Sequence, residues 1–166
     1  GFVGGVLCEA LAASARRVRR AVRASQPGLA DTVATGNIGP DTDWRSALEG
    51  VSSVVHLAAR THMLRETTSD ALAEYRHINV EGTRKLAQMA ARAGLRRLVF
   101  MSSIKVNGEA TERPFTERDV PRPEDAYGRS KWETEQALAH VAADTGLEVA
   151  VLRPPLVYGP GVKGNF

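Results

Sequence analysis

The chain has 166 residues, of which 43% are hydrophobic and 25% charged, and a formal net charge of +3, the ordinary composition of a soluble globular domain with one core. Its single cysteine, Cys8, excludes an internal disulfide and a cysteine-rich zinc site, fits a reducing compartment, and is most simply explained as a small apolar residue buried on a helix. No apolar stretch approaches the roughly 20 residues of a membrane span and no signal-peptide pattern opens the chain, so we expect a cytoplasmic protein.

Helical and strand patterns alternate through the first part of the chain. Apolar residues recur near helical spacing over residues 4–15, and residues 16–23 then hold five arginines, which could meet phosphate. The pattern predicts a strand over residues 17–23, a short strand and turn over 31–38, a short helix over 43–48 with Asp43 as its cap, and a buried strand over 51–58.

The second part of the chain continues the alternation with longer elements. A helical pattern covers residues 70–93, and Gly94 is placed to end it. A strand follows over residues 98–101, and a polar loop then covers residues 108–125. A second long helix is predicted over residues 126–145 with Gly146 as its end, before a last strand over residues 148–152.

This alternation predicts an α/β fold with a doubly wound parallel sheet, because parallel strands need crossover connections that place helices on both faces. Both ends look cut, since no strand precedes Gly1 and no terminating element follows residue 163. We therefore expect a sheet that lacks its first strand. In such sheets the ligand lies beyond the carboxyl ends of the strands, so the residues that follow each strand form the candidate site.

The opening Gly1-Phe2-Val3-Gly4 has the form of the back half of a glycine-rich phosphate loop. Small residues let the backbone approach a pyrophosphate, and the following helix offers free N–H groups and a positive dipole end. Two glycines before a helix also form simple tight turns, so this segment by itself is weak support for a phosphate site.

Tyr127 and Lys131 lie four residues apart at the start of the second long helix, and therefore on one helical face. A phenol with a pKa of about 10 is a poor base near neutrality, but a nearby ammonium favours the phenolate. Ser103, which follows the strand over residues 98–101, could hydrogen-bond the same substrate oxygen, and Lys131 could hold a cofactor ribose. A solvated pair on a helix face is the alternative explanation of this spacing.

Six segments of the chain occur in an order that is specific to one family. They are Gly1-Phe2-Val3-Gly4, Val54-Val55-His56-Leu57-Ala58-Ala59, Asn79-Val80-Glu81-Gly82-Thr83, Phe100-Met101-Ser102-Ser103, Tyr127-Gly128-Arg129-Ser130-Lys131 and Arg153-Pro154-Pro155-Leu156-Val157-Tyr158-Gly159-Pro160-Gly161. With them the chain resembles the extended short-chain dehydrogenases/reductases of the NAD-dependent epimerase/dehydratase family, specifically their UDP-glucose 4-epimerase-like group. The resemblance covers nearly all of the chain.

The resemblance implies a Rossmann-type NAD(P)-binding domain over residues 1–163, with a substrate domain beginning at residues 164–166. It implies Ser103, Tyr127 and Lys131 as the catalytic residues. The expected substrate is a nucleotide sugar, most simply a UDP-linked one, and no metal is expected. Family members commonly pair through the two long helices, so a homodimer is also expected.

The resemblance further implies which residues contact the cofactor. Gly1 and Gly4 would touch the pyrophosphate, and Asn79 would contact the cofactor from its helix. The segment after the strand over residues 51–58 would line the inner ribose and phosphates, and the segment after the last strand would border the nicotinamide. The implied set is Gly1, Phe2, Val3, Gly4, Arg23, Asn37, Ile38, Leu57, Ala58, Ala59, Arg60, Asn79, Ser102, Tyr127, Lys131, Pro154 and Val157.

Two histidines lie near this set. His56 lies inside its strand and is expected to be a packed, hydrogen-bonded histidine rather than a catalyst. His62 follows the same strand on the expected active-site side, where a role beside the substrate and simple exposure to solvent are both open.

The choice between NAD and NADP depends on the residue after the second strand of the family's sheet. Members that prefer NAD carry an acidic residue there, which accepts hydrogen bonds from the ribose 2′-OH. This chain has Arg23, which suits the 2′-phosphate of NADP, with Ser25 as a helper, unless Arg23 simply faces water. Asn37-Ile38 likewise replaces the usual Asp-hydrophobic pair beside the adenine. NADP is slightly favoured and NAD stays open.

The residues after Ser103 narrow the reaction. The 4,6-dehydratases that resemble this chain carry an Asp-Glu pair there, and this chain has Ile104-Lys105, which argues against dehydration. An epimerase acting at sugar C4 is favoured. A 4-keto-sugar reductase of bacterial polysaccharide synthesis is the alternative, because Asn107 stands where UDP-galactose 4-epimerases usually carry tyrosine.

Two hypotheses from other classes are weaker. A non-catalytic NAD(P)-binding sensor would typically lose the Tyr/Lys pair, which is intact here. Nucleic-acid binding through the arginines of residues 16–23 is not favoured, because these residues flank and occupy a predicted strand without interleaved aromatic residues.

Overall fold

The computed structural model describes residues 1–25, 28, 30–61 and 71–162, and within them all paired strands run parallel. The strands are Arg20–Val22 (β1), Thr32–Ala34 (β2), Ser53–His56 (β3), Arg97–Met101 (β4) and Glu148–Leu152 (β5). They form two ladders, one of β1 and β2 and one in the order β3-β4-β5. The predicted α/β fold with parallel strands is confirmed. His62 and residues 164–166, where a second domain was predicted to begin, lie outside the described residues.

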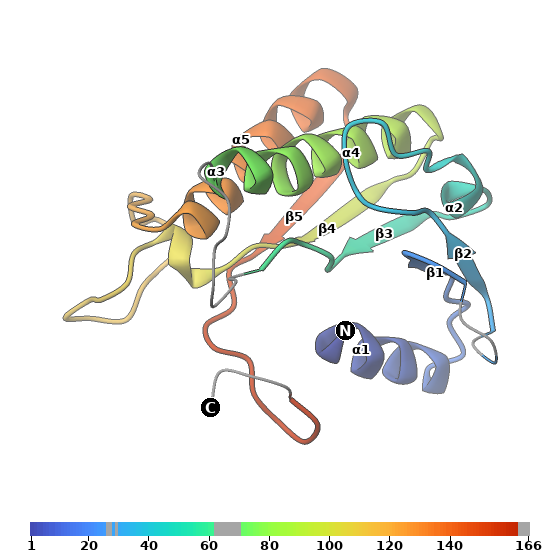
Figure 1. Ribbon diagram of the computed structural model, residues 1–166, viewed down its shortest axis with the longest axis horizontal. Helices are drawn as coiled ribbons and strands as arrows, with labels where there is room; N and C mark the ends of the chain where they lie inside the picture. Colours follow the sequence, from blue (N-terminus) through green and yellow to red (C-terminus); the bar gives the residue numbers. More distant parts are fainter. Residues whose placement is uncertain (26–27, 29, 62–70, 163–166) are drawn as a thin grey trace.

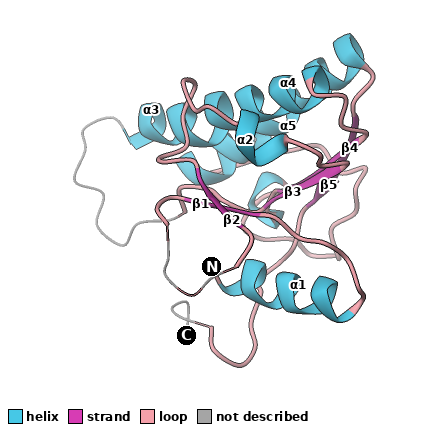
Figure 2. Ribbon diagram, turned by 90° about the vertical axis from the view of Figure 1, so that its right-hand side faces the viewer, coloured by secondary structure: helices cyan, strands magenta, loops and turns pink. Residues whose placement is uncertain are grey.

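Helices lie on both sides of the strands (Figure 1; Figure 2). One side holds α1, and the other holds α3, α4 and α5 together. The helices are Phe2–Ala13 (α1), Arg45–Leu48 (α2), Ala71–Tyr75 (α3), Gly82–Arg92 (α4) and Ala126–Thr145 (α5), with a π-helical turn at Arg76–Glu81 (η1) and a 3₁₀ turn at Ile104–Val106 (η2). Among the described residues, no helix combines the length and apolar character that crossing a membrane requires.

The hydrophobic core lies between β4 and the two long helices. Leu98 and Phe100 alternate along β4 and are 0% and 1% exposed. They share one buried cluster with Leu86 of α4 and Leu138 of α5. Burying a side chain of this size contributes about 1.5–3 kcal/mol relative to leaving it in water. This packing fixes the carboxyl end of β4 against α5, and that end carries the candidate catalytic residues.

Helix α5 begins and ends at residues whose chemistry stops a helix. Asp125 is its N-cap, and the Asp125 carboxylate accepts the N–H of Gly128 at 2.6 Å. Gly146 ends it in the left-handed region at φ +76°, which favours glycine. The predicted bounds of this helix are confirmed, and Tyr127 lies in its first turn.

The first helix begins earlier than predicted and is poorly covered. α1 starts at Phe2 rather than Gly4, so the glycine-rich opening is its first turn. None of its residues is buried, and Cys8, which was expected to be buried, is only half-buried. The burial prediction was wrong because apolar spacing identifies a helix face but does not supply the surface that covers it.

Two predicted strands are shorter in the structure. The strand predicted over residues 17–23 is limited to β1, and the one predicted over 51–58 is limited to β3. β3 was expected to be buried, but only His56 is, and Val55 is 42% exposed. Successive strand residues point to opposite faces, so Val55 faces the side of α1, which leaves it accessible to water.

The helix predicted over residues 70–93 is interrupted by a different helical geometry. Asp70 lies outside the described residues, and the chain then runs through α3, the π-helical turn η1 and α4 before Gly94 at φ +74°. Single π-helical turns within α-helices are frequent at functional sites. The turn here carries Asn79.

The short helix predicted over residues 43–48 begins at Arg45, so Asp43 is not its N-cap. The Asp43 carboxylate still accepts the Arg45 N–H at 3.0 Å and pairs with the Arg45 guanidinium at 2.6 Å. These bonds hold the pKa of Asp43 at about 2. Asp43 therefore bonds to the start of the helix from the position before the N-cap, which is Trp44.

Candidate functional site

The candidate site lies at the carboxyl ends of the three-stranded ladder, where parallel α/β sheets bind their ligands. Leu57 follows β3, Ser103 comes two residues after β4, and Pro154 comes two residues after β5. The ends of β4 and β5 stay linked beyond the strands, because the N–H of Ile104 donates to the Pro154 carbonyl at 3.0 Å. Helix α5 begins beside these ends, since α5 packs on η2.

Tyr127 and Lys131 project from one face of α5 and lie close together. The Lys131 Nζ is 5.9 Å from the centre of the Tyr127 ring and 4.4 Å from the centre of the Phe100 ring. A cation is attracted to an aromatic face at such distances. The structure thus brings the two side chains together at the end of β4.

The ammonium of Lys131 is buried in an unusual way for a charged group. Lys131 is 2% exposed, and it forms no salt bridge with any described residue. Burial lowers the pKa of Lys131 to about 8, and the charge of Glu135 partly opposes that effect. Lys131 is therefore still charged at neutral pH, with N–H donors suited to the hydroxyl groups of a ribose.

The Tyr127 phenol is partly buried against α3. Its ring meets the edge of the Tyr75 ring, with 6.2 Å between the ring centres. Burial and then the charge of Asp125 raise the pKa of Tyr127, while the charge of Lys105 and a hydrogen bond with Ser103 lower it. Without a further positive charge Tyr127 is protonated at neutral pH, so it serves as a base only when more positive charge is close.

Ser103 reaches Tyr127 from the neighbouring strand. It is the N-cap of η2, and its hydroxyl oxygen accepts the N–H of Lys105 at 3.2 Å. The Ser103 side chain is also close enough to Tyr127 to lower the pKa of the phenol. The two side chains are therefore neighbours, as a shared contact with one substrate oxygen would require.

Ser102, which the sequence placed among the cofactor residues, uses its hydroxyl within the protein. Its Oγ donates to Glu135 Oε1 at 2.5 Å, and Glu135 is held by Arg153 through contacts of 2.5 and 2.9 Å. Arg153 also donates to Asn107 Oδ1 at 3.2 Å. This buried network joins the ends of β4 and β5 to α5. A contact of Ser102 with a cofactor stays a prediction.

Asn79 ties the segment after β3 to helix α5. Its Oδ1 accepts the N–H of Arg60 at 2.8 Å, and its Nδ2 donates to the Arg60 carbonyl at 3.1 Å and to Ser130 Oγ at 3.0 Å. Its carbonyl accepts the Thr134 hydroxyl at 3.1 Å. Asn79 is 2% exposed, both N–H donors of its amide are used by these bonds, and its amide oxygen accepts one. Its side chain therefore shapes the segment that was predicted to line the cofactor, and a direct cofactor contact stays a prediction.

The start of α1 lies beside two of the predicted cofactor segments. A Cβ built on Gly4 would lie 3.6 Å from the Leu57 side chain, and one built on Gly159 would lie 3.4 Å from the Phe2 ring. The first-turn N–H groups of an α-helix have no partner within the helix. Phe2, Val3 and Gly4 therefore have main-chain N–H groups without a partner in the helix, near the segments that follow β3 and β5, and Gly1 lies directly before them, which fits a pyrophosphate site.

The residues predicted to contact the adenosine part of the cofactor are more exposed than the residues around Tyr127 and Lys131. Arg23 follows β1 directly and is exposed, as is Asn37. Ile38 is partly buried, and its side chain would lie 2.5 Å from a Cβ built on Gly82, so this approach requires glycine at the start of α4. Ala58, Ala59 and Val157 line no described pocket, and their proposed contacts stay predictions.

His56 is packed within the protein, as predicted. It is 5% exposed, its Nε2 lies 3.0 Å from the Thr83 hydroxyl, and its ring stacks on Phe100 with 6.2 Å between centres. Burial, and then the charge of Lys131, lower the pKa of His56 to about 3. It is therefore neutral across the physiological range. No group of three or more metal-ligating side chains occurs among the described residues.

Three charged residues of the site were not identified as such from the sequence. Asp125 caps α5, and the order Asp-x-Tyr at a helix start was an available signal. Glu135 lies four residues after Lys131, on the same helical face. Lys105 had been used only as an argument against dehydration, whereas the structure places its ammonium 2.7 Å from the Asp125 carboxylate.

The chain matches known proteins over its whole length. The sequence model of the NAD dependent epimerase/dehydratase family matches residues 1–166. The UDP-glucose 4-epimerase of Vibrio cholerae is 43% identical over 173 residues, which cover 100% of this chain and 52% of that protein. The chain thus spans about half the length of this relative.

Solved structures share the fold. MoeE5 in complex with UDP-glucuronic acid and NAD is 32% identical at a TM-score of 0.85, covering 100% of this chain and 55% of that one. MoeE5 in complex with UDP-glucose and NAD is 33% identical at a TM-score of 0.82, covering 98% of this chain and 54% of that one.

Proposed function

Because the chain belongs to the NAD dependent epimerase/dehydratase family, we propose that the protein is an NAD(P)-dependent nucleotide-sugar epimerase. In this proposal Tyr127 is the acid/base at sugar C4. The observation that carries the proposal is the buried Lys131 ammonium, which lies beside Tyr127 on α5 and has no ion-pair partner among the described residues. A charge kept in such a place at a cost in stability favours a functional role.

The residues of the site divide the work of a hydride transfer. A bound dinucleotide supplies a carbon that accepts a hydride and returns it. Ser103 and Tyr127 hold the C4 oxygen of the sugar between their hydroxyl groups. As phenolate, Tyr127 takes the proton from that oxygen while the C4–H bond breaks, and gives it back after the keto sugar has turned. Lys131 stabilises the phenolate and donates to the cofactor ribose.

The comparisons support a nucleotide sugar as the substrate class. The Vibrio cholerae relative is a UDP-glucose 4-epimerase, and the MoeE5 structures hold UDP-glucose or UDP-glucuronic acid with NAD. These ligands belong to proteins about twice the length of this chain, so a UDP-linked substrate for this protein is part of the proposal.

The proposal is tested by offering the purified protein UDP-glucose and UDP-N-acetylglucosamine and following the C4 configuration by NMR. An epimerase interconverts the C4 epimers with no net use of NAD(P)H, because the hydride returns to the same sugar carbon. A reductase instead consumes NADPH stoichiometrically with a 4-keto-6-deoxy sugar. Turnover of none of these sugars, with the dinucleotide still bound, would leave a sensor as the function.

Tyr127→Phe is the decisive variant. It removes the acid/base and keeps the ring that packs on Tyr75. We expect activity to fall by about 10²–10⁴-fold while dinucleotide binding, followed by fluorescence, stays unchanged. Tyr158→Phe, which alters an exposed phenol, is the matched control. Unchanged activity in Tyr127→Phe would exclude Tyr127 as the acid/base.

The selectivity between NAD and NADP depends on the exposed part of the site that is expected to contact the adenosine. The solved MoeE5 structures contain NAD, whereas the exposed Arg23 after β1 favours the 2′-phosphate of NADP. We propose that Arg23 allows NADP beside NAD. Arg23→Ala is expected to weaken NADP binding by about tenfold, the value of one charge-assisted contact, and to leave NAD binding unchanged. Equal losses for both would show that Arg23 does not read the 2′ position.

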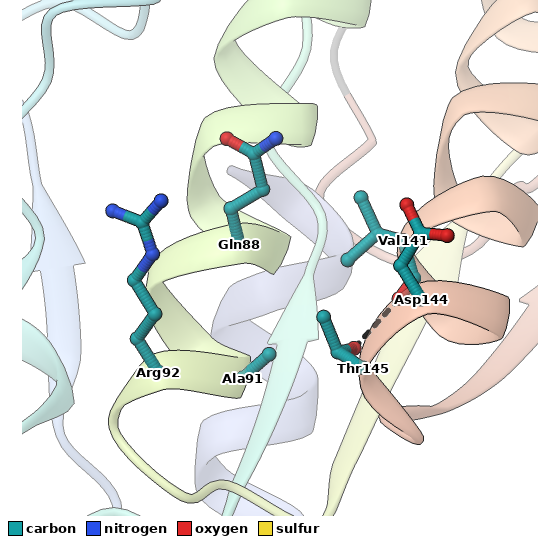
Figure 3. A pocket seen from close by; sticks show the side chains of 6 residues that line it. All are labelled: Gln88, Ala91, Arg92, Val141, Asp144 and Thr145. Atoms are coloured by element: carbon teal, nitrogen blue, oxygen red, sulfur yellow. Dashed lines mark hydrogen bonds between the residues drawn. The ribbon is translucent and has the colours of Figure 1, made fainter.

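We also propose a homodimer formed through α4 and α5. The two helices lie side by side, and a shallow groove between them is lined by Gln88, Ala91, Arg92, Val141, Asp144 and Thr145 (Figure 3). Sedimentation of Ala91→Glu is expected to show monomers, whereas Ala13→Glu on α1 keeps the dimer. A dimer in both variants would place the interface elsewhere.

A further inference from the structure

Lys105 lies in η2 and joins the segments that carry the two hydroxyl groups of the site. Its main-chain N–H donates to Ser103 Oγ at 3.2 Å, and its ammonium pairs with the Asp125 carboxylate at 2.7 Å. Asp125 in turn accepts the N–H of Gly128, the residue after Tyr127, at 2.6 Å. A continuous series of bonds therefore runs from Ser103 to the first turn of α5.

The main chain of η2 also packs directly on that first turn. A Cβ built on Gly128 would lie 2.8 Å from the Lys105 carbonyl oxygen and 3.1 Å from Asp125 Oδ1. Real Cβ atoms do not approach a backbone oxygen this closely, so the contact requires glycine. Lys105 thus holds α5 in two ways, through its carbonyl against Gly128 and through its ammonium on the cap.

The charges of Lys105 and Asp125 act in opposite directions on Tyr127. Burial has the largest effect and raises the pKa of Tyr127, Asp125 raises it further, and Lys105 lowers it. The polar and charged groups that face Tyr127 from the described residues are Tyr75 of α3, Ser103 and Lys105 of the segment after β4, and Asp125 and Lys131 of α5. Lys105 is the group that offsets the carboxylate which α5 uses as its cap.

We propose that Lys105 is a positioning residue for proton transfer: it holds the Ser103 hydroxyl against Tyr127 and neutralises the Asp125 carboxylate at the start of the same helix. The inference rests on the proposed function of Tyr127 as the acid/base. Glu109 binds the same ammonium at 2.8 Å but is not part of the series from Ser103 to α5, so it provides a control.

Four variants separate charge from structure. Lys105→Met removes the charge and keeps an unbranched side chain, and Lys105→Arg keeps the charge. Asp125→Asn keeps an oxygen acceptor for the helix cap but removes the negative charge. Glu109→Gln removes the second carboxylate partner of Lys105 and is expected to leave turnover within about twofold of the parent, since exposed pairs of this kind contribute about 0–1 kcal/mol.

Lys105→Met and Asp125→Asn are expected to shift the pH dependence of kcat in opposite directions. In the parent, kcat should rise with pH as Tyr127 loses its proton. In Lys105→Met the pH at which kcat reaches half of its maximum is expected to be about one unit higher, so that kcat at a fixed lower pH falls by about tenfold. In Asp125→Asn that pH falls, because the carboxylate that raises the pKa of Tyr127 is gone while the Lys105 ammonium remains. A double variant that combines Lys105→Met with Asp125→Asn is expected to return close to the parent, and Lys105→Arg is expected to keep most of kcat. The KM for the sugar and the dinucleotide affinity change little in all four.

A second measurement does not depend on turnover. The phenolate of Tyr127 is titrated by its ultraviolet absorbance, with Tyr127→Phe subtracted to remove the other two of the three tyrosines. The titration midpoint is expected to rise in Lys105→Met and fall in Asp125→Asn. If the protein turns over no sugar, the proposed function fails and this titration still decides the role of Lys105. An unchanged midpoint in both variants, or a loss of kcat that is equal at every pH and not restored by arginine, overturns the inference.

Discussion

The carboxyl-terminal region, defined as β3, β4 and β5 with α4 and α5, and the amino-terminal region, defined as α1, β1 and β2, are packed very differently. In the former, Leu98 and Leu138 are 0% exposed and lie in one buried cluster. In the latter, no residue of the three elements is buried, and Val6 on α1 is 57% exposed. The carboxyl-terminal region contains the buried core, and the amino-terminal region meets it through the partly buried Val33 of β2.

The residues of the proposed site are divided between the two regions. Tyr127 and Lys131 belong to the tightly packed region, and Ser103 lies two residues beyond its strand β4, so neighbouring side chains can fix their positions before any ligand binds. Gly1 and Arg23, which we propose contact the cofactor, belong to the open region. The proposed proton-transfer residues should therefore depend on the packing of the carboxyl-terminal region more than on that of the amino-terminal region.

Breaking the buried pair of Glu135 and Arg153 should have the largest effect. Glu135→Ala leaves the Arg153 guanidinium without its carboxylate inside the protein and removes the acceptor of Ser102. Loss of one partner of a fully buried ion pair costs about 3–5 kcal/mol, which is an upper bound here because Arg153 is half-buried. Urea unfolding should show this loss, whereas Glu148→Ala, which breaks an exposed pair with Arg97, should cost about 0–1 kcal/mol. Similar losses in both would show that the buried network does not hold this region together.

A matched pair of core truncations compares the two regions directly. Leu98→Ala, in the centre of β4, is expected to destabilise the fold by about 2–5 kcal/mol, the usual cost of an emptied core position. Val6→Ala on α1 is expected to change it by less than about 0.5 kcal/mol, since the side chain is already largely in water. Equal effects, measured by chemical denaturation, would contradict the contrast between the regions.

Removing the buried charge of Lys131 should stabilise the protein while stopping its chemistry. The pKa of Lys131 is lowered to about 8 by burial, so the folded state binds this proton less well than the unfolded chain does. The resulting loss of stability is complete below about pH 8 and disappears as the pH approaches 10.5. Lys131→Met should therefore raise the unfolding free energy at pH 7 by an amount on the order of 1–3 kcal/mol, with the gain fading at high pH. A destabilised Lys131→Met would mean that the ammonium has stronger partners than the described residues provide.

Acidification should weaken the same region through His56. Its pKa is lowered to about 3, below the unfolded value of 6.5, so the folded state resists protonation. The stability that neutral His56 contributes is present above about pH 6.5 and is lost as the pH falls toward 3. His56→Gln, which removes the titration and keeps a polar partner for Thr83, should lose about 1–2 kcal/mol less than the parent between pH 7 and pH 5. An identical pH dependence in both proteins would assign acid unfolding to other groups.

Patterns that depend on neighbouring residues were read correctly from the sequence. The bounds of α5 follow from an apolar period and from Gly146, whose φ of +76° suits glycine, and β4 follows from a run of large apolar residues. The spacing of Tyr127 and Lys131 put both on one helical face for the same reason. Errors arose where a prediction needed to know what covers a surface, as for the burial of Cys8 and β3.

The sequence by itself determined the α/β fold class, the family and the residue types of the site, because local periodicity and ordered motifs record them directly. Only the tertiary structure decided which groups meet: Asp125 with Lys105 at 2.7 Å, Glu135 with Arg153 at 2.5 Å, and Lys131 buried between two aromatic rings. These contacts join residues that are mostly far apart in the sequence, such as Lys131 and Phe100, and their strength depends on burial, which packing sets and no single segment encodes.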